Sequence, residues 1–393
     1  MKLIVLFIFI ICFCLPLFAT DFGAIINCQF NAEKESETSI GARTTAMPWL
    51  LLPVREMDFY LSAGAHIDYG NPMDFIPELF RLELSARLSD SLSLRIGRLS
   101  WQDASRFTAG GTFDGADLLV NLDSMRLGAA VLYTGLQYKE TAKINPSPGT
   151  DYSENFSWDD FSGTYFAPPR VVASLYGEFP AFPYERGQTS AALLTQFDLS
   201  DAPEAYHSQY LVLRHSLVYM VWDFNFAAAV QAENTEMQGF RTAYALSAEA
   251  GVQLPGDLRD RLSLGVRWAS GEGSSTAAFF PIIREAQGTV LKPHLSGIMV
   301  IRANYQARIL PSLSAEIGGR YLLRTDETSF IDPEISGESH SLGAELDGNI
   351  LWAPFPDLSV SLAGGIFLPK TGSAFNSETP VRWTITLGTI FSF

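Results

Sequence analysis

The chain has 393 residues and a formal net charge of −16 at pH 7, and it carries 28 Phe, 14 Tyr, 7 Trp and 31 Gly. The negative charge argues against a nucleic-acid partner. Even without the N-terminal segment described next, the chain is long for one soluble core, whereas its length is ordinary for one large closed barrel.

The chain begins with a short apolar segment. Lys2 supplies a positive charge, residues 3–18 are almost continuously apolar, and Ala19 offers a small residue for cleavage. This pattern is typical of a secretory signal peptide. The alternative is a membrane anchor, but the run is short for a bilayer-spanning helix. We therefore predict a signal peptide over residues 1–20 and a single domain over residues 21–393.

Alternation of apolar and polar residues dominates the rest of the chain. Clear examples are residues 80–88, 295–308, 313–324 and 358–368. This period is the signature of strands, and runs of about ten residues are typical of membrane barrels. A soluble β-sandwich or β-helix predicts the same alternation, but its strands are usually shorter. The sequence therefore predicts an all-β protein, a transmembrane antiparallel β-barrel.

Short and long connections alternate along the chain, as the periplasmic turns and extracellular loops of such barrels do. Two strands before Glu56, around residues 23–33 and 39–46, bring the count to about 18, with 16 as the alternative. We expect long connections at 69–78, 100–113, 139–169, 200–205, 234–239, 271–293, 325–338 and 369–380, and short ones at 89–90, 123–124, 215–216, 254–257, 310–312 and 354–356, with 180–187 as a longer connection on the short side.

The last predicted strand, residues 381–393, ends in Phe393. Its apolar face should meet lipid while the strand closes against the first one. A terminal Phe resembles the ending that bacterial outer-membrane barrels commonly carry. That resemblance implies that Phe393 is an assembly signal read by the barrel-assembly machinery, and it places the chain in the bacterial outer membrane.

The face opposite the apolar one is rich in arginine. Arginine suits carboxylates, sulfates and phosphates, and a ring of arginines in a pore favours anions. The alternative is structural pairing with acidic residues of the same face, such as Arg81 with Glu83, or Arg320 with Glu316. We expect the pore lining to include Arg81, Arg87, Arg95, Arg126, Arg241, Arg267, Arg302, Arg308, Arg320, Arg324 and Arg382. The prediction of an anion-selective pore depends most on a cluster on adjacent predicted strands, formed by Arg302, Arg308, Arg320 and Arg324.

Two long connections carry acidic residues. Asp151, Glu154, Asp159 and Asp160 lie in 139–169 with several aromatic residues, and five more acids lie in 325–338. We interpret both as a solvated acidic surface; the alternatives are a cation-binding rim or a loop folded into the pore.

Several stretches resemble known barrels. Residues 97–100 and 107–116 resemble a strand–loop–strand segment of porin-type barrels, and residues 340–347, 352–358 and 364–369 are similar to the C-terminal part of the alginate-export family. That family implies a monomeric 18-stranded barrel with an arginine-lined pore for an anionic polysaccharide.

We predict an outer-membrane porin or exporter that gives passive passage to small anionic solutes or an acidic polysaccharide, with membrane lipid as its surroundings and with no cofactor or metal. One alternative is a plugged structural or adhesive barrel, and another is a hydrophobic-substrate transporter, whose usual N-terminal plug is missing here. An enzyme could use His66 with Asp68, or His207 near Asp201 and Glu204, but histidine is scarce, with five residues. We therefore expect no catalysis.

Overall fold

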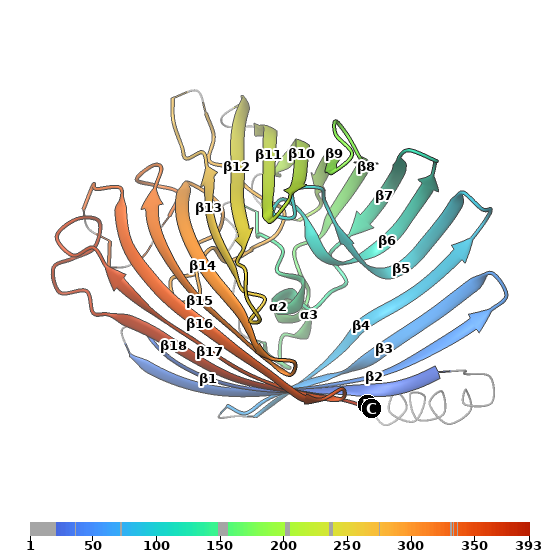
Figure 1. Ribbon diagram of the computed structural model, residues 1–393, viewed down its shortest axis with the longest axis horizontal. Coiled ribbons are helices and arrows are strands. Elements are labelled where there is room, and N and C mark those ends of the chain that lie inside the picture. The colour runs from blue at the N-terminus through green and yellow to red at the C-terminus, as the bar shows by residue number, and fades with distance from the viewer. Residues whose placement is uncertain are drawn as a thin grey trace.

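The computed structural model describes residues 21–393 except 36, 71–72, 148–155, 201–204, 236–238, 275, 331, 333 and 336. The predicted signal peptide and Asp151, Glu154, Asp201 and Glu204 lie outside the described residues. The chain forms one closed antiparallel sheet of 18 strands (Figure 1). The strands are β1 (Asp21–Lys34), β2 (Thr38–Val54), β3 (Met57–Asp68), β4 (Asp74–Arg87), β5 (Leu92–Gln102), β6 (Gly110–Asn121), β7 (Arg126–Tyr133), β8 (Arg170–Pro180), β9 (Gly187–Asp198), β10 (His207–Tyr219), β11 (Trp222–Thr235), β12 (Gly239–Gln253), β13 (Arg261–Ala269), β14 (Ile298–Leu310), β15 (Leu313–Arg324), β16 (Ser341–Phe355), β17 (Leu358–Pro369) and β18 (Arg382–Ser392).

The first and last strands close the barrel. β1 pairs with β18 from Ile25 opposite Ser392 to Lys34 opposite Trp383. Beyond that ladder, the backbone N–H of Ala24 donates to the carbonyl of Phe393 at 2.8 Å. Closure leaves no unpaired sheet edge, which a barrel in lipid requires. The predicted fold class and the count of 18 strands are confirmed.

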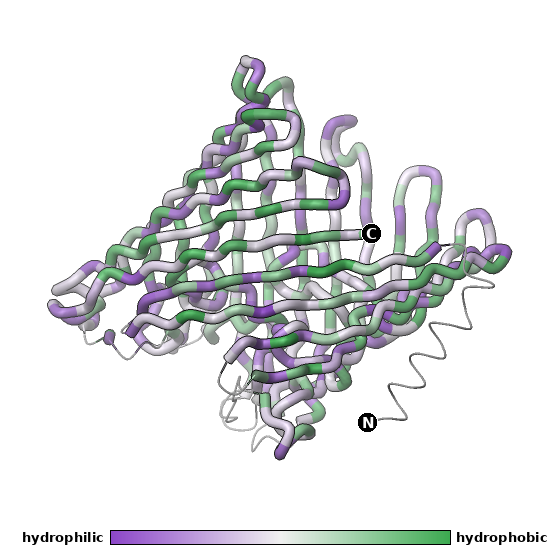
Figure 2. The backbone as a smooth tube through the Cα atoms, turned by 90° about the horizontal axis from the view of Figure 1, so that it is seen from below, coloured by the Kyte–Doolittle hydropathy of each residue, from purple (hydrophilic) through white to green (hydrophobic). Residues whose placement is uncertain are grey.

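Side chains alternate across the barrel wall, as the strand period dictates. In β10, Leu211 and Leu213 are 45% and 47% exposed on the outside, whereas Tyr210 and Val212 are buried. Figure 2 shows the same alternation of hydropathy along the strands. A closed barrel with an apolar outer band is the architecture of bacterial outer-membrane proteins, and the predicted localisation to that membrane is confirmed.

Among the helices of the described residues, none is long and apolar enough to cross a membrane.

Two details of the prediction were wrong. The turn expected at residues 215–216 lies inside β10, and the chain turns instead at Met220 and Val221, with φ of +55° at Met220. Neither residue is a usual turn former, so the sequence carries no signal there. The second strand is also longer than expected, because β2 runs on to Val54.

Three of the long connections fold into the barrel instead of standing outside it. They are residues 103–109, residues 134–169 without 148–155, and residues 270–297 without 275, and the second contains α2 (Lys139–Ala142) and α3 (Phe161–Tyr165). Figure 1 shows both helices in the middle of the ring of strands. Buried apolar residues of these segments join inner-wall residues in one core that includes Phe107, Ile144, Phe279, Ile282, Val172 and Val212. In the described part of 139–169, Ile144 is buried, whereas Asp159 and Asp160 are exposed, so the solvated acidic surface expected there stays a prediction.

Candidate functional site

The three inward segments are joined to one another, and we call them together the lumenal unit. Ile282 donates its backbone N–H to Thr108 at 2.8 Å, and Asn145 donates to Ile282 at 3.0 Å. Ile144 also pairs with Ile283 in a short antiparallel bridge. The three segments of the lumenal unit are therefore connected, and together they occupy part of the barrel interior.

Carboxylates of the wall anchor the lumenal unit. Glu345 of β16, fully buried, accepts the backbone N–H groups of residues 289, 290 and 291 at 2.6, 3.0 and 3.0 Å. On the β2–β4 side, Arg43 donates to Glu140 of α2 at 2.7 Å, and Thr141 donates to Glu78 at 2.9 Å. These charge-assisted bonds hold the unit against both sides of the wall.

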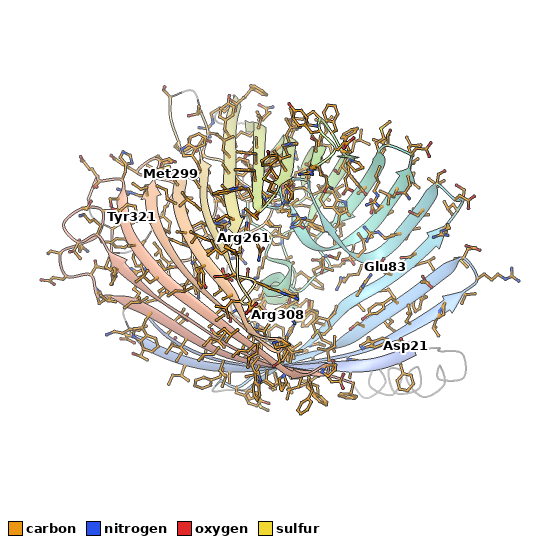
Figure 3. The ribbon with its side chains drawn as sticks, in the orientation of Figure 1. Asp21, Glu83, Arg261, Met299, Arg308 and Tyr321 are labelled. Carbon is orange, nitrogen blue, oxygen red and sulfur yellow. The ribbon has the colours of Figure 1, made fainter. Side chains whose placement is uncertain are left out.

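Most of the predicted pore-lining arginines contact carboxylates. Figure 3 shows Glu83, Arg261 and Arg308 directed toward the middle of the ring. The ion pairs are Arg81–Glu83, Arg95–Asp117, Arg126–Glu178, Arg241–Glu233 and –Glu272, Arg267–Glu285, Arg302–Glu249, Arg320–Glu345 and –Asp347, and Arg382–Asp332 and –Glu334. Pairing of Arg81 with Glu83 agrees with the alternative reading, but Arg320 pairs with β16 acids and not with Glu316.

The remaining three arginines have different surroundings. Arg324 is buried and donates to the carbonyls of Gly337 and Ser339, both at 2.8 Å, so it fixes a connection. Arg308 donates to the carbonyl of Pro311 at 2.7 Å. In the part of the chain that the structure describes, the exposed Arg87 has no side-chain partner. The cluster Arg302, Arg308, Arg320 and Arg324 thus does not converge on one site.

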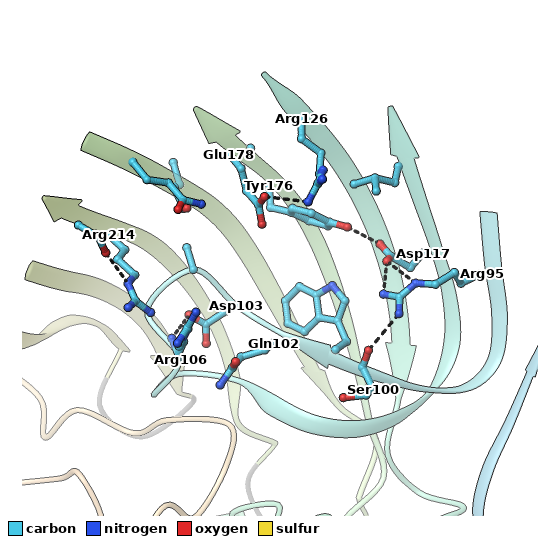
Figure 4. A pocket seen from close by; sticks show the side chains of 18 residues that line it. Arg95, Ser100, Gln102, Asp103, Arg106, Asp117, Arg126, Tyr176, Glu178 and Arg214 are labelled. Carbon is cyan, nitrogen blue, oxygen red and sulfur yellow. Dashed lines mark hydrogen bonds and ion pairs between the residues drawn. The ribbon is translucent and has the colours of Figure 1, made fainter. Parts of the chain in front are cut away.

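A cavity of about 440 Å³ lies between the first inward segment and strands β5–β10. Four arginines line it, namely Arg95, Arg106, Arg126 and Arg214, together with the carboxylates Asp103, Asp117 and Glu178 (Figure 4). We call this cavity the arginine pocket.

One side of the arginine pocket is neutralised. Arg95 donates to Asp117 at 2.6 Å, and the hydroxyl of Tyr176 donates to the other oxygen of Asp117 at 2.7 Å. Arg126 donates to Glu178 at 3.2 Å. Each guanidinium on this side therefore has its own carboxylate.

The other side holds two arginines that form no ion pair within the described residues. Arg214 donates to Ser216 at 3.4 Å and to Asn225 at 3.2 Å, both uncharged. Within the described residues, the guanidinium of the exposed Arg106 has no hydrogen-bond or ion-pair partner. The sequence prediction missed both, because Arg106 lies in an expected loop and Arg214 adjoined the turn expected at 215–216.

The histidines considered for catalysis have structural partners. Buried His66 contacts Thr45 at 2.8 Å and Glu78 through its other ring nitrogen, while Asp68 binds Arg43. His207 accepts the backbone N–H of Asp198 at 3.2 Å. Across the described residues, no group of three or more His, Cys, Asp or Glu side chains is arranged to hold a metal.

No family model matches the sequence, and no curated protein matches it. Solved structures do match along nearly the whole chain. The Pseudomonas aeruginosa outer membrane protein OpdK has 13% identity and a TM-score of 0.58, covering 96% of this chain and 100% of that one. OpdK with vanillate gives 12% and 0.63, and OccK2 (OpdF) in complex with glucuronate gives 14% and 0.62, each covering 96% of this chain and 99% of the other.

The chain has the fold of these outer-membrane proteins. The likeness supports the predicted resemblance to porin-type barrels at the level of fold.

Proposed function

We propose that this barrel is an outer-membrane porin that gives passive passage to small anionic solutes. The observation that carries the proposal is the arginine pocket, where four arginines face three carboxylates. A cavity lined by an excess of one charge raises the local concentration of the opposite ion. Glucuronate and vanillate, which are named with two of the similar structures, are both carboxylates.

The lumenal unit favours small solutes over a polymer. Its segments cross from the β2–β4 wall, where Arg43 binds Glu140, to β16, where Glu345 holds residues 289–291. An acidic polysaccharide, which the alginate-export resemblance implies, would need this unit to move aside. A plugged structural or adhesive barrel remains the competing function, and conductance separates the two.

The proposal includes the predicted processing and topology. Residues 1–20 would be the signal peptide, the domain would begin near Asp21, and the end of the barrel with short turns would face the periplasm, as in other such barrels. We further propose a monomer that needs no catalytic group and that the assembly machinery inserts through its terminal Phe393.

Single-channel recording in a planar bilayer tests the proposal. With a KCl gradient, the reversal potential should show anion selectivity, and Arg214→Gln should reduce the selectivity because it removes a positive lumenal charge that forms no ion pair. The double variant Arg126→Gln/Glu178→Gln is the matched control, since it removes a neutral pair from the same pocket. A silent wild-type barrel, or a cation-selective one, would overturn the proposal.

A further inference from the structure

We infer that His66, Glu78 and Thr141 form a proton-sensitive latch, which holds α2 against the barrel wall more firmly when the imidazole of His66 is protonated. The latch is a conformational device built into the fold. It goes beyond the proposed function, because it concerns how the second inward segment is held and not which solute passes.

The first step is the chain of contacts from the wall to α2. Buried His66 of β3 contacts the hydroxyl of Thr45 of β2 through Nδ1 at 2.8 Å, and it contacts Oε2 of Glu78 of β4 through Nε2. The same oxygen of Glu78 accepts the hydroxyl of Thr141 of α2 at 2.9 Å. One carboxylate therefore separates the imidazole from the helix that lies in the middle of the ring of strands (Figure 1).

The second step is the charge of Glu78. Its side chain is buried, and among the residues that the structure describes His66 is the only basic side chain that forms an ion pair with it. A buried carboxylate without a positive partner is costly. Protonation of His66 supplies that partner, because imidazolium and carboxylate then form a buried ion pair. The oxygen that anchors Thr141 is thereby stabilised in place.

The third step is the hydrogen bonding of the two protonation states. A neutral imidazole can donate to Glu78 through Nε2 and accept the hydroxyl of Thr45 at Nδ1, whereas an imidazolium donates through both nitrogens and the oxygen of Thr45 accepts. Both states keep both contacts. The ring can therefore gain or lose a proton without moving, in the pH range from about 5 to 8 where imidazoles ordinarily change charge.

The fourth step is the charge around the latch. The tyrosines that face it are Tyr138, whose ring centroid lies 5.9 Å from that of His66, and Tyr165 of α3. The charged side chains come from the wall and from α2, and they are Arg43, Asp68, Asp74, Arg98, Asp114, Lys139 and Glu140. Together with Glu78 they include more carboxylates than basic groups, and negative surroundings favour the imidazolium.

The fifth step is the coupling between protonation and docking of α2. Glu140, one of the carboxylates near the latch, belongs to α2 itself, and Thr141 of α2 binds Glu78 directly. A helix in place therefore adds negative charge near His66 and covers Glu78. Because coupling of two equilibria is reciprocal, a proton on His66 must in turn favour the docked helix.

Hydrogen exchange of α2 in the refolded barrel tests the latch. The backbone N–H groups of Ala142 and Lys143 donate to the carbonyls of Tyr138 and Lys139 at 2.9 and 3.1 Å, so their exchange reports opening of this turn. Measurements at about pH 5.5 and about pH 7.5 lie on either side of the ordinary imidazole pKa of about 6.5. Protection, corrected for the chemical exchange rate at each pH, should be roughly fivefold higher at the lower pH, equivalent to about 1 kcal/mol.

His66→Gln is the first variant, because an amide can donate to Glu78 and accept from Thr45 but does not titrate. It should keep α2 in place and abolish the pH dependence of its protection. His340→Gln is the matched control, since His340 contacts the carbonyl of Arg324 at 3.1 Å, away from α2. It should keep the wild-type pH dependence.

Thr141→Val is the second variant, and it does not disturb the buried groups. Thr141 is exposed, so the barrel should fold, while the link between Glu78 and α2 is lost. The pH dependence at Ala142 and Lys143 should disappear here as well. A wild-type protection that is equal at both pH values, or higher at the higher pH, would overturn the latch, and so would a His66→Gln or Thr141→Val protein that titrates like the wild type.

Failure of the latch and failure of the porin are distinct, because hydrogen exchange needs no current. A silent or cation-selective wild type overturns the proposed function and leaves the exchange result standing. An anion-selective channel whose α2 shows no pH dependence overturns the latch alone.

Discussion

Arg302 of β14 lies directly opposite Arg320 of β15 in the barrel wall, and each arginine binds its own carboxylates. Arg302 pairs with Glu249, and Arg320 donates to Glu345 at 2.6 Å and lies 2.9 Å from Asp347. Like charges opposite each other destabilise a sheet, so the acids of β12 and β16 are what make this arrangement stable. We therefore expect these arginines to stabilise the barrel wall more than they attract solute.

The double variant Arg320→Gln/Asp347→Asn, which conserves the lumenal charge, should destabilise the barrel and hardly change its anion selectivity. It leaves Glu345, which is fully buried, without its guanidinium, and loss of one partner of a buried ion pair costs about 3 kcal/mol. Thermal unfolding in detergent and reversal potentials measure the two effects. A loss of selectivity as large as that of Arg214→Gln would place Arg320 on the solute path.

We expect the contact of Glu140 with Arg43 to limit the single-channel conductance. Glu140→Gln combined with Thr141→Val removes two side-chain bonds between α2 and the β2–β4 wall, while Arg43 keeps its bond of 2.6 Å to Asp68. The lumenal unit then loses one of its anchors, and we expect a larger and noisier single-channel conductance.

Arg81→Gln/Glu83→Gln is the matched control for that variant, because its ion pair joins residues of one strand and ties no lumenal segment. Its conductance should stay near the wild-type value. Equal conductance of the two double variants would show that α2 does not limit the current.

The fold was predictable because its physics is local. Alternation along each strand and the succession of short and long connections predicted the class and the closure of the barrel, and a count of about 18 strands with 16 as the alternative. Met220 and Val221 form a turn without Gly, Pro, Asn or Asp, so the turn signal was missing there. The inward course of 270–297 did have a signal, the apolar run from Ala277 to Ile283, which a solvated loop would not need.

The site was less predictable, because pairing depends on neighbours distant in sequence. Strand period places Arg95 and Asp117 on the inner face, but only the register brings them opposite each other. Arg106 and Arg214 stand apart because neither guanidinium forms an ion pair within the described residues, and no period reveals that. A sequence prediction therefore lists the lumenal arginines without separating those that form ion pairs from those that do not.

Phe393→Ala should reduce the amount of barrel in the outer membrane of cells and leave the refolded barrel intact. The Phe393 side chain is 66% exposed, and its backbone bonds to Ala24 do not need the ring. The β1–β18 ladder also persists without it. Quantitative outer-membrane blots measure the amount of barrel in the membrane, and heat-dependent gel mobility shows whether the refolded barrel is intact. Normal membrane levels would contradict a role as assembly signal.

Acidification should release the connection that Asp332 holds. Burial alone would raise the pKa of Asp332, but the hydrogen bonds from Arg382 and from the backbone N–H of Glu334, with the charge of Arg382, keep this pKa below its usual range. A carboxyl with a lowered folded pKa stabilises the fold above the unfolded value of about 3.9 and loses that contribution as the pH falls through the folded pKa.

Asp332→Asn tests this sign. At pH 7 the variant should unfold at a lower temperature than the wild type. The expected loss in free energy of unfolding is about 2 kcal/mol, the contribution of hydrogen bonds to a charged group. Arg382 binds Asp332 at 2.7 Å and Glu334 at 3.2 Å, so a partial loss is expected. The difference between the two proteins should shrink as the pH falls below about 3.9, and a difference that grows on acidification would contradict the assignment. Ser377→Ala, in the neighbouring connection, should show no pH-dependent difference.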